Sequence, residues 1–262
     1  MTVGCIEYLF CGLTYYLPFY SQSVLGANAL DSGLHLLPIV VSSSLAAAMT
    51  GLLIQKTGKY LPIMYAAQTM TLLGVGLLIS LDVNQDLAVL LGFQVIVGIG
   101  VGMNIEPPLI AAQASTTVMD TAVVVATMGF GCSIATAISV VIGGVLFQNQ
   151  MASSYGQLED ALGSELAPLF NGATATENIN RIGELPEAGQ VVVREAFFRA
   201  LRSVWIMYIV ATGLSAVSNL FVRAKHLSKD VEDVVLGAKR DKPSAATTTG
   251  QSEGHGLVPG SE

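Results

Sequence analysis

Long apolar segments separated by short polar connections follow one another along the first 147 residues. A helix needs about 20 residues to cross the hydrocarbon core of a bilayer. Segments of that length span residues 2–24, 33–54, 61–81, 87–112 and 121–147, and one more spans residues 203–223. The pattern therefore predicts an all-α polytopic membrane protein with six transmembrane helices.

Residues 148–202 form the one long connection between the predicted spans, and they are much more polar than the spans. Apolar residues recur there every three or four positions, which predicts a short amphipathic helix. These residues are Met151, Tyr155, Leu158, Leu162 and Leu166. A second helix is expected to begin near Pro186 and to lead into the last span. From Gly237 onward the chain is rich in Ser, Thr, Gly and Pro, and residues 224–262 are expected to form a mostly disordered tail.

Composition agrees with a membrane protein. Hydrophobic residues make up 52% of the chain and charged residues 12%, and the mean hydropathy is +0.61. A soluble domain carries about 25% charged residues. Most of the charges gather in the long connection and in the tail, and the net charge of the whole chain is −7. No basic patch dense enough to bind nucleic acid is present in the sequence.

Lys56 and Lys59 are the only Lys or Arg residues before Arg181, and they form a short basic turn between two apolar segments. Because cationic loops remain on the cytoplasmic side of a membrane, this turn is predicted to be cytoplasmic. Four predicted spans separate the turn from the tail. Because an even number of spans returns the chain to the same side, the tail is predicted to be cytoplasmic as well. By the same parity, the acidic loop at residues 82–86 and the long connection are predicted to lie on the outer side.

Glu106, in the fourth span, is the main candidate for proton coupling. An ionisable side chain at membrane depth is costly and is expected to face a cavity or a partner. A carboxylate there could take up and release a proton. Pro107 and Pro108 are expected to kink the helix beside it. The alternative is that Glu106 lies close enough to the cytoplasmic interface to be partly hydrated. Glu7, in the first span, is a second candidate, with a position at the interface as its alternative.

Aromatic and polar side chains give the first and fourth spans the character of a ligand pocket. Rings with polar tips suit flat, amphipathic ligands, and side-chain amides can form hydrogen bonds with them. The substrate-path candidates are Tyr15, Tyr16, Phe19, Gln22, Gln94 and Asn104. The alternatives are an aromatic belt at the outer interface for the rings and hydrogen bonds between helices for the amides.

The sequence offers no Ser/His/Asp constellation, metal-binding cluster or phosphate-binding loop. Gly98, Gly100 and Gly102 have the spacing of a nucleotide loop, but no strand precedes them and they lie within a predicted span. Neither an enzyme nor a cofactor is therefore expected. The expected partners are the lipid bilayer, a small amphipathic substrate and protons.

The basic turn carries a recognisable signature. The string Gly51-x-x-x-Gln55-Lys56-x-Gly58-Lys59 resembles the loop signature of the major facilitator superfamily, which follows the second helix of each half. It departs from that signature at Gln55, where an acidic residue is usual. Further strings are similar to the fungal fourteen-span drug:proton antiporters, and the resemblance covers about residues 5–225. These strings lie at residues 15–26, 32–38, 106–113 and 143–150.

The resemblance implies a six-helix C-terminal bundle of a major facilitator fold. Its implied function is the export of drugs, toxins or secondary metabolites, driven by inward movement of protons. The basic turn would then lock and release the bundle during alternating access. The implied location is the plasma membrane, with the vacuolar membrane as the alternative.

The apolar segment that begins directly after Met1 has no basic flank. This indicates the C-terminal part of a larger protein, or a truncated gene product, which would need the missing N-terminal half or a second copy to transport. The other hypotheses are a non-transporting membrane remnant and part of a siderophore or nutrient carrier of the same superfamily.

Overall fold

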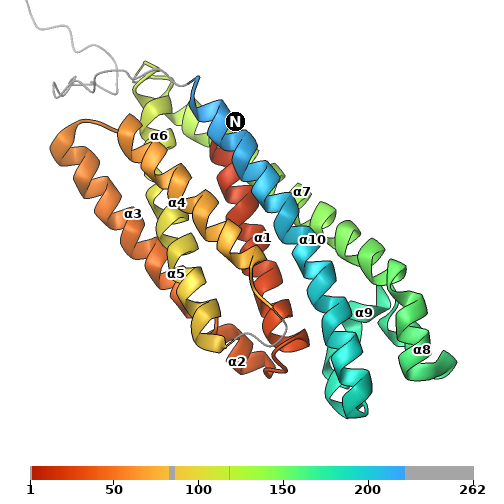
Figure 1. Cartoon of the computed structure of the whole chain (residues 1–262). Helices are drawn as coiled ribbons and strands as arrows, with labels where there is room; N and C mark the ends of the chain where they lie inside the picture. The colour runs from red at the N-terminus through yellow and green to blue at the C-terminus, as the bar shows by residue number, and fades with distance from the viewer. Residues whose placement is uncertain (1, 83–85, 118, 222–262) are drawn as a thin grey trace, which may run out of the picture. The chain divides into compact units, whose positions relative to one another are not determined.

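The computed structural model describes residues 2–82, 86–117 and 119–221, with side chains from Gly12 onward. All regular elements in these ranges are helices, and no strand occurs among them (Figure 1). They are α1 (Thr2–Ser23), α2 (Ala29–Leu34), α3 (Leu37–Thr57), α4 (Leu61–Ile79), α5 (Leu87–Met103), α6 (Glu106–Gln113), α7 (Thr121–Ser153), α8 (Tyr155–Leu166), the 3-10 helix η1 (Ala167–Phe170), α9 (Thr174–Glu177), the 3-10 helix η2 (Ile179–Glu184) and α10 (Glu187–Asn219). The predicted tail at residues 224–262 lies outside the described residues.

Five helical stretches in the described part are long and apolar enough to cross a membrane. They are Ala29–Thr57, Leu61–Ile79, Leu87–Gln113, Thr121–Ser153 and Glu187–Asn219. The helix α1 is 22 residues long, which also suffices to span a bilayer. The predicted class, an all-helical polytopic membrane protein, is confirmed.

The long helices pack in two groups of three. In one group, α5 packs against both α3 and α4; in the other, α1, α7 and α10 all contact one another (Figure 1). Contacts between α4 and α10 join the groups. Apolar side chains from both groups form one continuous core. The group of α3, α4 and α5 is consecutive in the sequence, whereas the other group brings α1 together with the distant helices α7 and α10.

Glycines let α5 approach its two neighbours closely. A Cβ atom on Gly98 or Gly102 would collide with the backbone of α3, whereas a Cβ on Gly100 would lie 2.5 Å from the amide nitrogen of Thr71 in α4. Small residues that allow backbones to approach are typical of helix packing in membranes. These three glycines are therefore contact points between helices.

Helix ends differ from the predicted spans at two places that matter for the site. The helix α3 continues past residue 54 to Thr57, and Gly58 ends it in a left-handed conformation with φ +67°. The predicted span at 87–112 is interrupted, because α5 ends at Met103 and α6 begins at Glu106.

The long connection contains short helices that pack together, and we call this unit the cap. The helices α7 and α10, each of 33 residues, extend beyond the predicted spans into the sequence of this connection. Between them, α8, η1, α9 and η2 bury apolar side chains that belong to the main core. These side chains are Leu158, Ala167, Phe170, Ala175, Ile179, Ile182 and Leu185.

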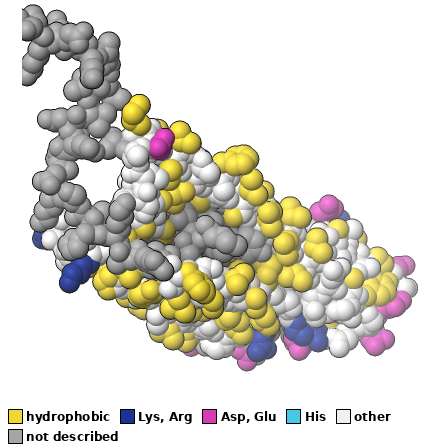
Figure 2. Space-filling model, turned by 90° about the horizontal axis from the view of Figure 1, so that it is seen from above, with side chains coloured by type: hydrophobic (Ala, Val, Ile, Leu, Met, Phe, Trp, Pro, Cys, Tyr) yellow, Lys and Arg dark blue, Asp and Glu magenta, His cyan; other side chains and the backbone are white. Residues whose placement is uncertain are grey.

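The surface separates apolar from charged side chains. Figure 2 shows hydrophobic side chains across much of the middle of the face in view, with most of its Asp and Glu side chains toward one end. This distribution fits a molecule whose middle is surrounded by lipid and whose charged end lies in water.

Candidate functional site

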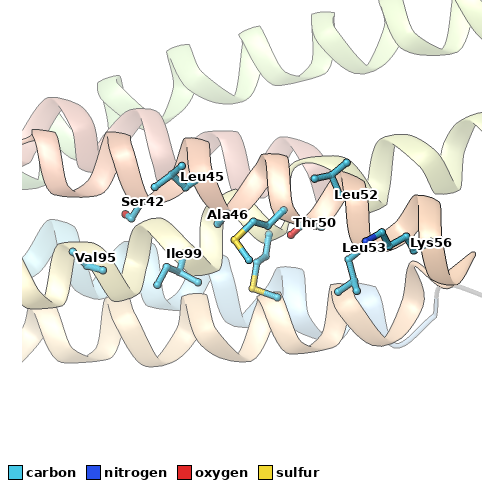
Figure 3. Close-up of a pocket in the computed structure, with 11 residues that line it drawn as sticks. Ser42, Leu45, Ala46, Thr50, Leu52, Leu53, Lys56, Val95 and Ile99 are labelled. Atoms are coloured by element: carbon cyan, nitrogen blue, oxygen red, sulfur yellow. The ribbon is translucent and has the colours of Figure 1, made fainter.

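An apolar groove with a volume of about 690 Å³ lies between α3 and α5. Its lining consists of Ser42, Leu45, Ala46, Met49, Thr50, Leu52, Leu53, Lys56, Val95, Ile99 and Met103. Figure 3 places Ser42 and Val95 toward one end of the groove and Lys56 at the other. Flexible Met side chains among branched aliphatic ones adapt to ligands of different shape. The groove can therefore hold an apolar molecule with a polar group near Lys56.

The predicted gating turn is split between a helix and its cap. Gly51, Gln55 and Lys56 belong to the last turns of α3, and Gly58 caps the helix by donating its backbone N–H to the Ile54 carbonyl at 2.7 Å. Lys56 and Lys59 are both exposed. Only a residue that tolerates a positive φ can end the helix at position 58, which explains Gly58.

Glu106 is the first residue of α6 and is partly buried. The helix α6 contacts α1, α3, α4, α5 and α7, so Glu106 stands close to where both helix groups meet. No hydrogen bond or ion pair joins its carboxylate to a described residue. Glu106 is thus an ionisable side chain within a membrane-spanning stretch, without a fixed counter-charge among the described residues.

Pro107 and Pro108 start a helix rather than bend one. Both are buried in the first turn of α6, where the missing backbone N–H groups have no helical acceptor in any case. The interruption lies before them, at Asn104 and Ile105, whose N–H groups bond only three residues back, to Val101 and Gly102. The predicted kink is thus a break between two helices.

A buried amide cluster lies beside this break. Gln68 of α4 accepts hydrogen bonds at its Oε1 from Asn104 Nδ2 at 2.9 Å and from Asn219 Nδ2 at 3.1 Å. Its Nε2 donates to the Thr212 carbonyl at 2.9 Å. Asn104 therefore forms a hydrogen bond between helices, which was the alternative to a role in ligand binding. Gln68 and Asn219 were not among the predicted residues, although polar residues within apolar spans are a signal for such contacts.

Gln94 of α5 is fully buried, and neither atom of its amide has a hydrogen-bond partner among the described residues. A buried amide without partners is energetically costly, by about 1–3 kcal/mol for each unsatisfied group. The side chain is therefore able to bind a polar group that enters the bundle, as a substrate-path residue would.

The aromatic side chains of α1 divide between core and surface. Tyr16 is buried and donates its hydroxyl hydrogen to the Val140 carbonyl of α7 at 2.9 Å. Tyr15 is 49% exposed and stacks on Phe19, with ring centroids 5.7 Å apart. Of these rings, Tyr15 is the one that a ligand could reach most directly.

The remaining predicted residues do not converge on the groove. Gln22 donates from Nε2 to Ser32 Oγ at 2.9 Å, which links α1 to α2. The side chain of Glu7 lies outside the described part of the molecule. Of all the predicted site residues, Lys56 alone is in the groove lining, whereas Met49 and Met103 line it without any signal in the sequence that separates them from other apolar residues. The described residues contain no His, Cys, Asp and Glu group suited to a metal ion.

Comparison with known proteins identifies relatives in fungi. The chain is 36% identical over 231 residues to the MFS-type transporter ppz2 of Metarhizium majus, a match that covers 88% of this chain and 40% of that protein. It is 38% identical over 239 residues to the efflux pump dotC of Dothistroma septosporum, covering 90% of this chain and 40% of the pump. An MFS-type transporter of Aspergillus terreus is 38% identical over 199 residues, covering 76% of this chain and 36% of its own length.

No protein-family model matches the chain, and no solved structure matches it significantly. The chain spans about two-fifths of the length of the curated relatives that it matches. Its long apolar helices and its fungal relatives make it an integral membrane protein. The chain belongs to the family of MFS-type transporters and corresponds to part of their length.

Proposed function

We propose that the chain is part of a proton-coupled secondary transporter that exports drugs, toxins or secondary metabolites by alternating access. Relatives that include the efflux pump dotC support export. The observation that carries proton coupling is the position of Glu106, a carboxylate inside a membrane-spanning stretch at the junction of the helix groups. It has no ion-pair partner among the described residues.

In this proposal, Glu106 takes up a proton from one side of the membrane and releases it on the other. Neutralising a carboxylate lowers the cost of surrounding it with apolar groups. Protonation would therefore favour the state in which α6 is packed tightly among its neighbours, and release would favour the more hydrated state. A transporter couples two gradients when proton and substrate shift the same conformational equilibrium.

The substrate is a small amphipathic molecule, in keeping with the groove between α3 and α5. Its apolar lining would hold the body of the molecule, while Lys56 and Thr50 would contact polar atoms. The partner is the remaining length of the transporter or a second copy of the chain. We place the protein in the plasma membrane, or alternatively the vacuolar membrane, with the turn at Lys56 and the tail on the cytoplasmic side.

The test measures efflux of a fluorescent amphipathic dye from membrane vesicles under an imposed pH gradient. The vesicles contain the chain alone or joined to the remaining part of a relative. We expect Glu106→Gln to reduce gradient-driven efflux to the level of vesicles without the chain, because the amide cannot carry a proton. The amount of folded protein should be unchanged. The matched control is Asp86→Asn, which removes an exposed carboxylate before α5 and should transport normally.

Normal efflux by Glu106→Gln would refute the coupling role. Gradient-driven flux in the opposite direction would indicate a nutrient or siderophore carrier. No flux from either the chain or the joined protein would indicate a non-transporting membrane remnant.

A further inference from the structure

Three arginines of α10 converge on a cleft beyond the ends of α1 and α4. Arg194, Arg199 and Arg202 line a cavity of about 450 Å³. With 3.6 residues per turn, positions 194, 202 and 199 span an arc of about 140° around the helix, and all three side chains line the same opening. The other residues of the lining are Val24, Asp82, Val191, Glu195 and Phe198.

The arginines are held in place without being neutralised. Arg194 donates from Nη2 to Gln190 Oε1 at 3.2 Å, and Arg199 donates from Nη2 to Gln157 Oε1 at 2.5 Å. Both acceptors are neutral amides. None of the three arginines forms an ion pair within 4.0 Å with a carboxylate of the described residues. The amides thus orient two guanidinium groups while leaving their charge available.

Two donors in the cleft also lack partners. The Nε atoms of Arg194 and Arg199 are buried and make no hydrogen bond with the described residues. A buried N–H group without an acceptor is costly, and an anionic ligand would supply acceptors for both. Beside them, the turn at Gly26 adopts a left-handed conformation with φ +69°, and a Cβ there would lie 3.1 Å from Arg194 Nη2. The absence of a side chain at Gly26 leaves room for the guanidinium.

The lining indicates the kind of anion. Guanidinium groups bind phosphate and carboxylate oxygens through paired hydrogen bonds, and a phosphate offers enough oxygens for several donors at once. Glu195 and Asp82 reduce the formal charge of the lining to a net single positive charge. This balance favours a singly charged phosphodiester over a dianion.

The position of the cleft indicates where such a group is found. The cleft lies just past the ends of two membrane-spanning helices, with Val24 following α1 and Asp82 following α4. Lipid phosphates occupy this level, at the boundary between hydrocarbon and water. We propose that this arginine cleft binds a phosphate group, carried by a phosphodiester lipid headgroup or free in solution. The proposal does not depend on transport or on proton coupling.

The experiment measures equilibrium binding to the purified chain in neutral detergent micelles. The probes are a short-chain phosphatidylglycerol, a diacylglycerol with the same acyl chains but no phosphate, and inorganic phosphate. We expect phosphatidylglycerol to bind at least about tenfold more tightly than the diacylglycerol, as charge-assisted hydrogen bonds of this kind allow. The double variant Arg194→Gln with Arg199→Gln should lose most of that preference.

Two further variants keep the test independent of folding. Arg202→Gln changes an exposed side chain that makes no hydrogen bond with the described residues, and it should weaken phosphatidylglycerol binding about threefold. Arg181→Gln removes the same charge from an exposed position in η2 that is not part of the cleft, and it should bind like the wild type.

Each outcome decides the proposal. Equal binding of phosphatidylglycerol and diacylglycerol overturns it, as does equal binding by the Arg202→Gln and Arg181→Gln variants. Loss of binding in the cleft variants alone supports it. Competition by inorganic phosphate at millimolar concentration then identifies free phosphate as a sufficient ligand, whereas binding of the lipid alone identifies the headgroup as the source.

Discussion

The glycines of α5 act as spacers at the scale of single residues. Gly102 faces the backbone of α3 at Ser43, so a methyl group at this position forces the two helices apart. We expect Gly102→Ala to lower the free energy of unfolding by about 1–3 kcal/mol, the usual cost of overpacking. The matched control is Gly92→Ala in the same helix, where a Cβ meets no atom within 4 Å.

Thermal unfolding of both variants in detergent micelles checks this prediction. Gly92→Ala should keep or slightly raise the stability, because alanine favours the helix. Equal stability of the two variants would contradict the role of Gly102 as a contact point.

Residue contacts were harder to predict than residue types. The sequence indicated that Asn104 forms a hydrogen bond with a ligand or with another helix, but not that Gln68 and Asn219 are its neighbours. The meeting of these amides depends on how α4, α5 and α10 rotate against one another. That rotation is set by the packing of the whole bundle. The spacing of apolar residues along one helix shows which face is apolar, but not which residues of other helices lie opposite it.

At the scale of elements, the turn between α3 and α4 combines a helix end with two cations. Lys56 lies in the last turn of α3, where a positive charge stabilises the negative end of the helix dipole. Both lysines also favour a cytoplasmic position. We expect Lys56→Ala with Lys59→Ala to impair the transport rate or the membrane orientation more than ligand binding.

Dye efflux, dye binding and the accessibility of the turn to a membrane-impermeant label measure these three properties. Arg181→Ala is the control, because it removes a cation from η2, in the cap. If the double variant kept both its transport rate and its orientation, the gating role of the turn would have to be abandoned.

The elements themselves were largely predictable where they are apolar. In a membrane, the backbone N–H and C=O groups of a long hydrophobic segment must form hydrogen bonds within the protein, which a helix achieves. The composition of these segments therefore predicts helices. The helix α10 begins at Glu187, next to the helix start expected near Pro186. The continuation of α7 to Ser153 did not follow, because helices outside the hydrocarbon no longer need apolar residues throughout. The packed cap was missed because its core joins residues far apart in the sequence.

At the scale of the whole molecule, the spans are unequally covered by the rest of the chain. In the most apolar part of each span, the share of residues buried inside the molecule is 44% for α4 and for Leu87–Gln113. The same share is only 22% for Ala29–Thr57 and 17% for α7. The exposed surface of α7 includes a row of small residues at helical spacing. These residues are Ala122, Ala126, Gly129, Ser133 and Ala137.

Small residues on a lipid-exposed helix allow another helix to approach closely. We therefore expect α7 to contact the partner proposed above, whether a second copy or the remaining length of the transporter. Gly129→Leu should reduce this association, because a Cβ at this position meets no atom of its own chain within 4 Å and its side chain would project outward. Cross-linking or energy transfer between labelled chains in lipid nanodiscs measures the associated fraction.

Gly76→Leu provides the matched control, since a Cβ at Gly76 in α4 also meets no atom within 4 Å. The two substitutions add the same apolar volume without disturbing the fold of the single chain, so a difference between them reports on the surface that α7 presents. Reduced association in Gly129→Leu alone would identify α7 as the contact. If both variants associated as the wild type does, α7 would face lipid, and its small residues would need another explanation.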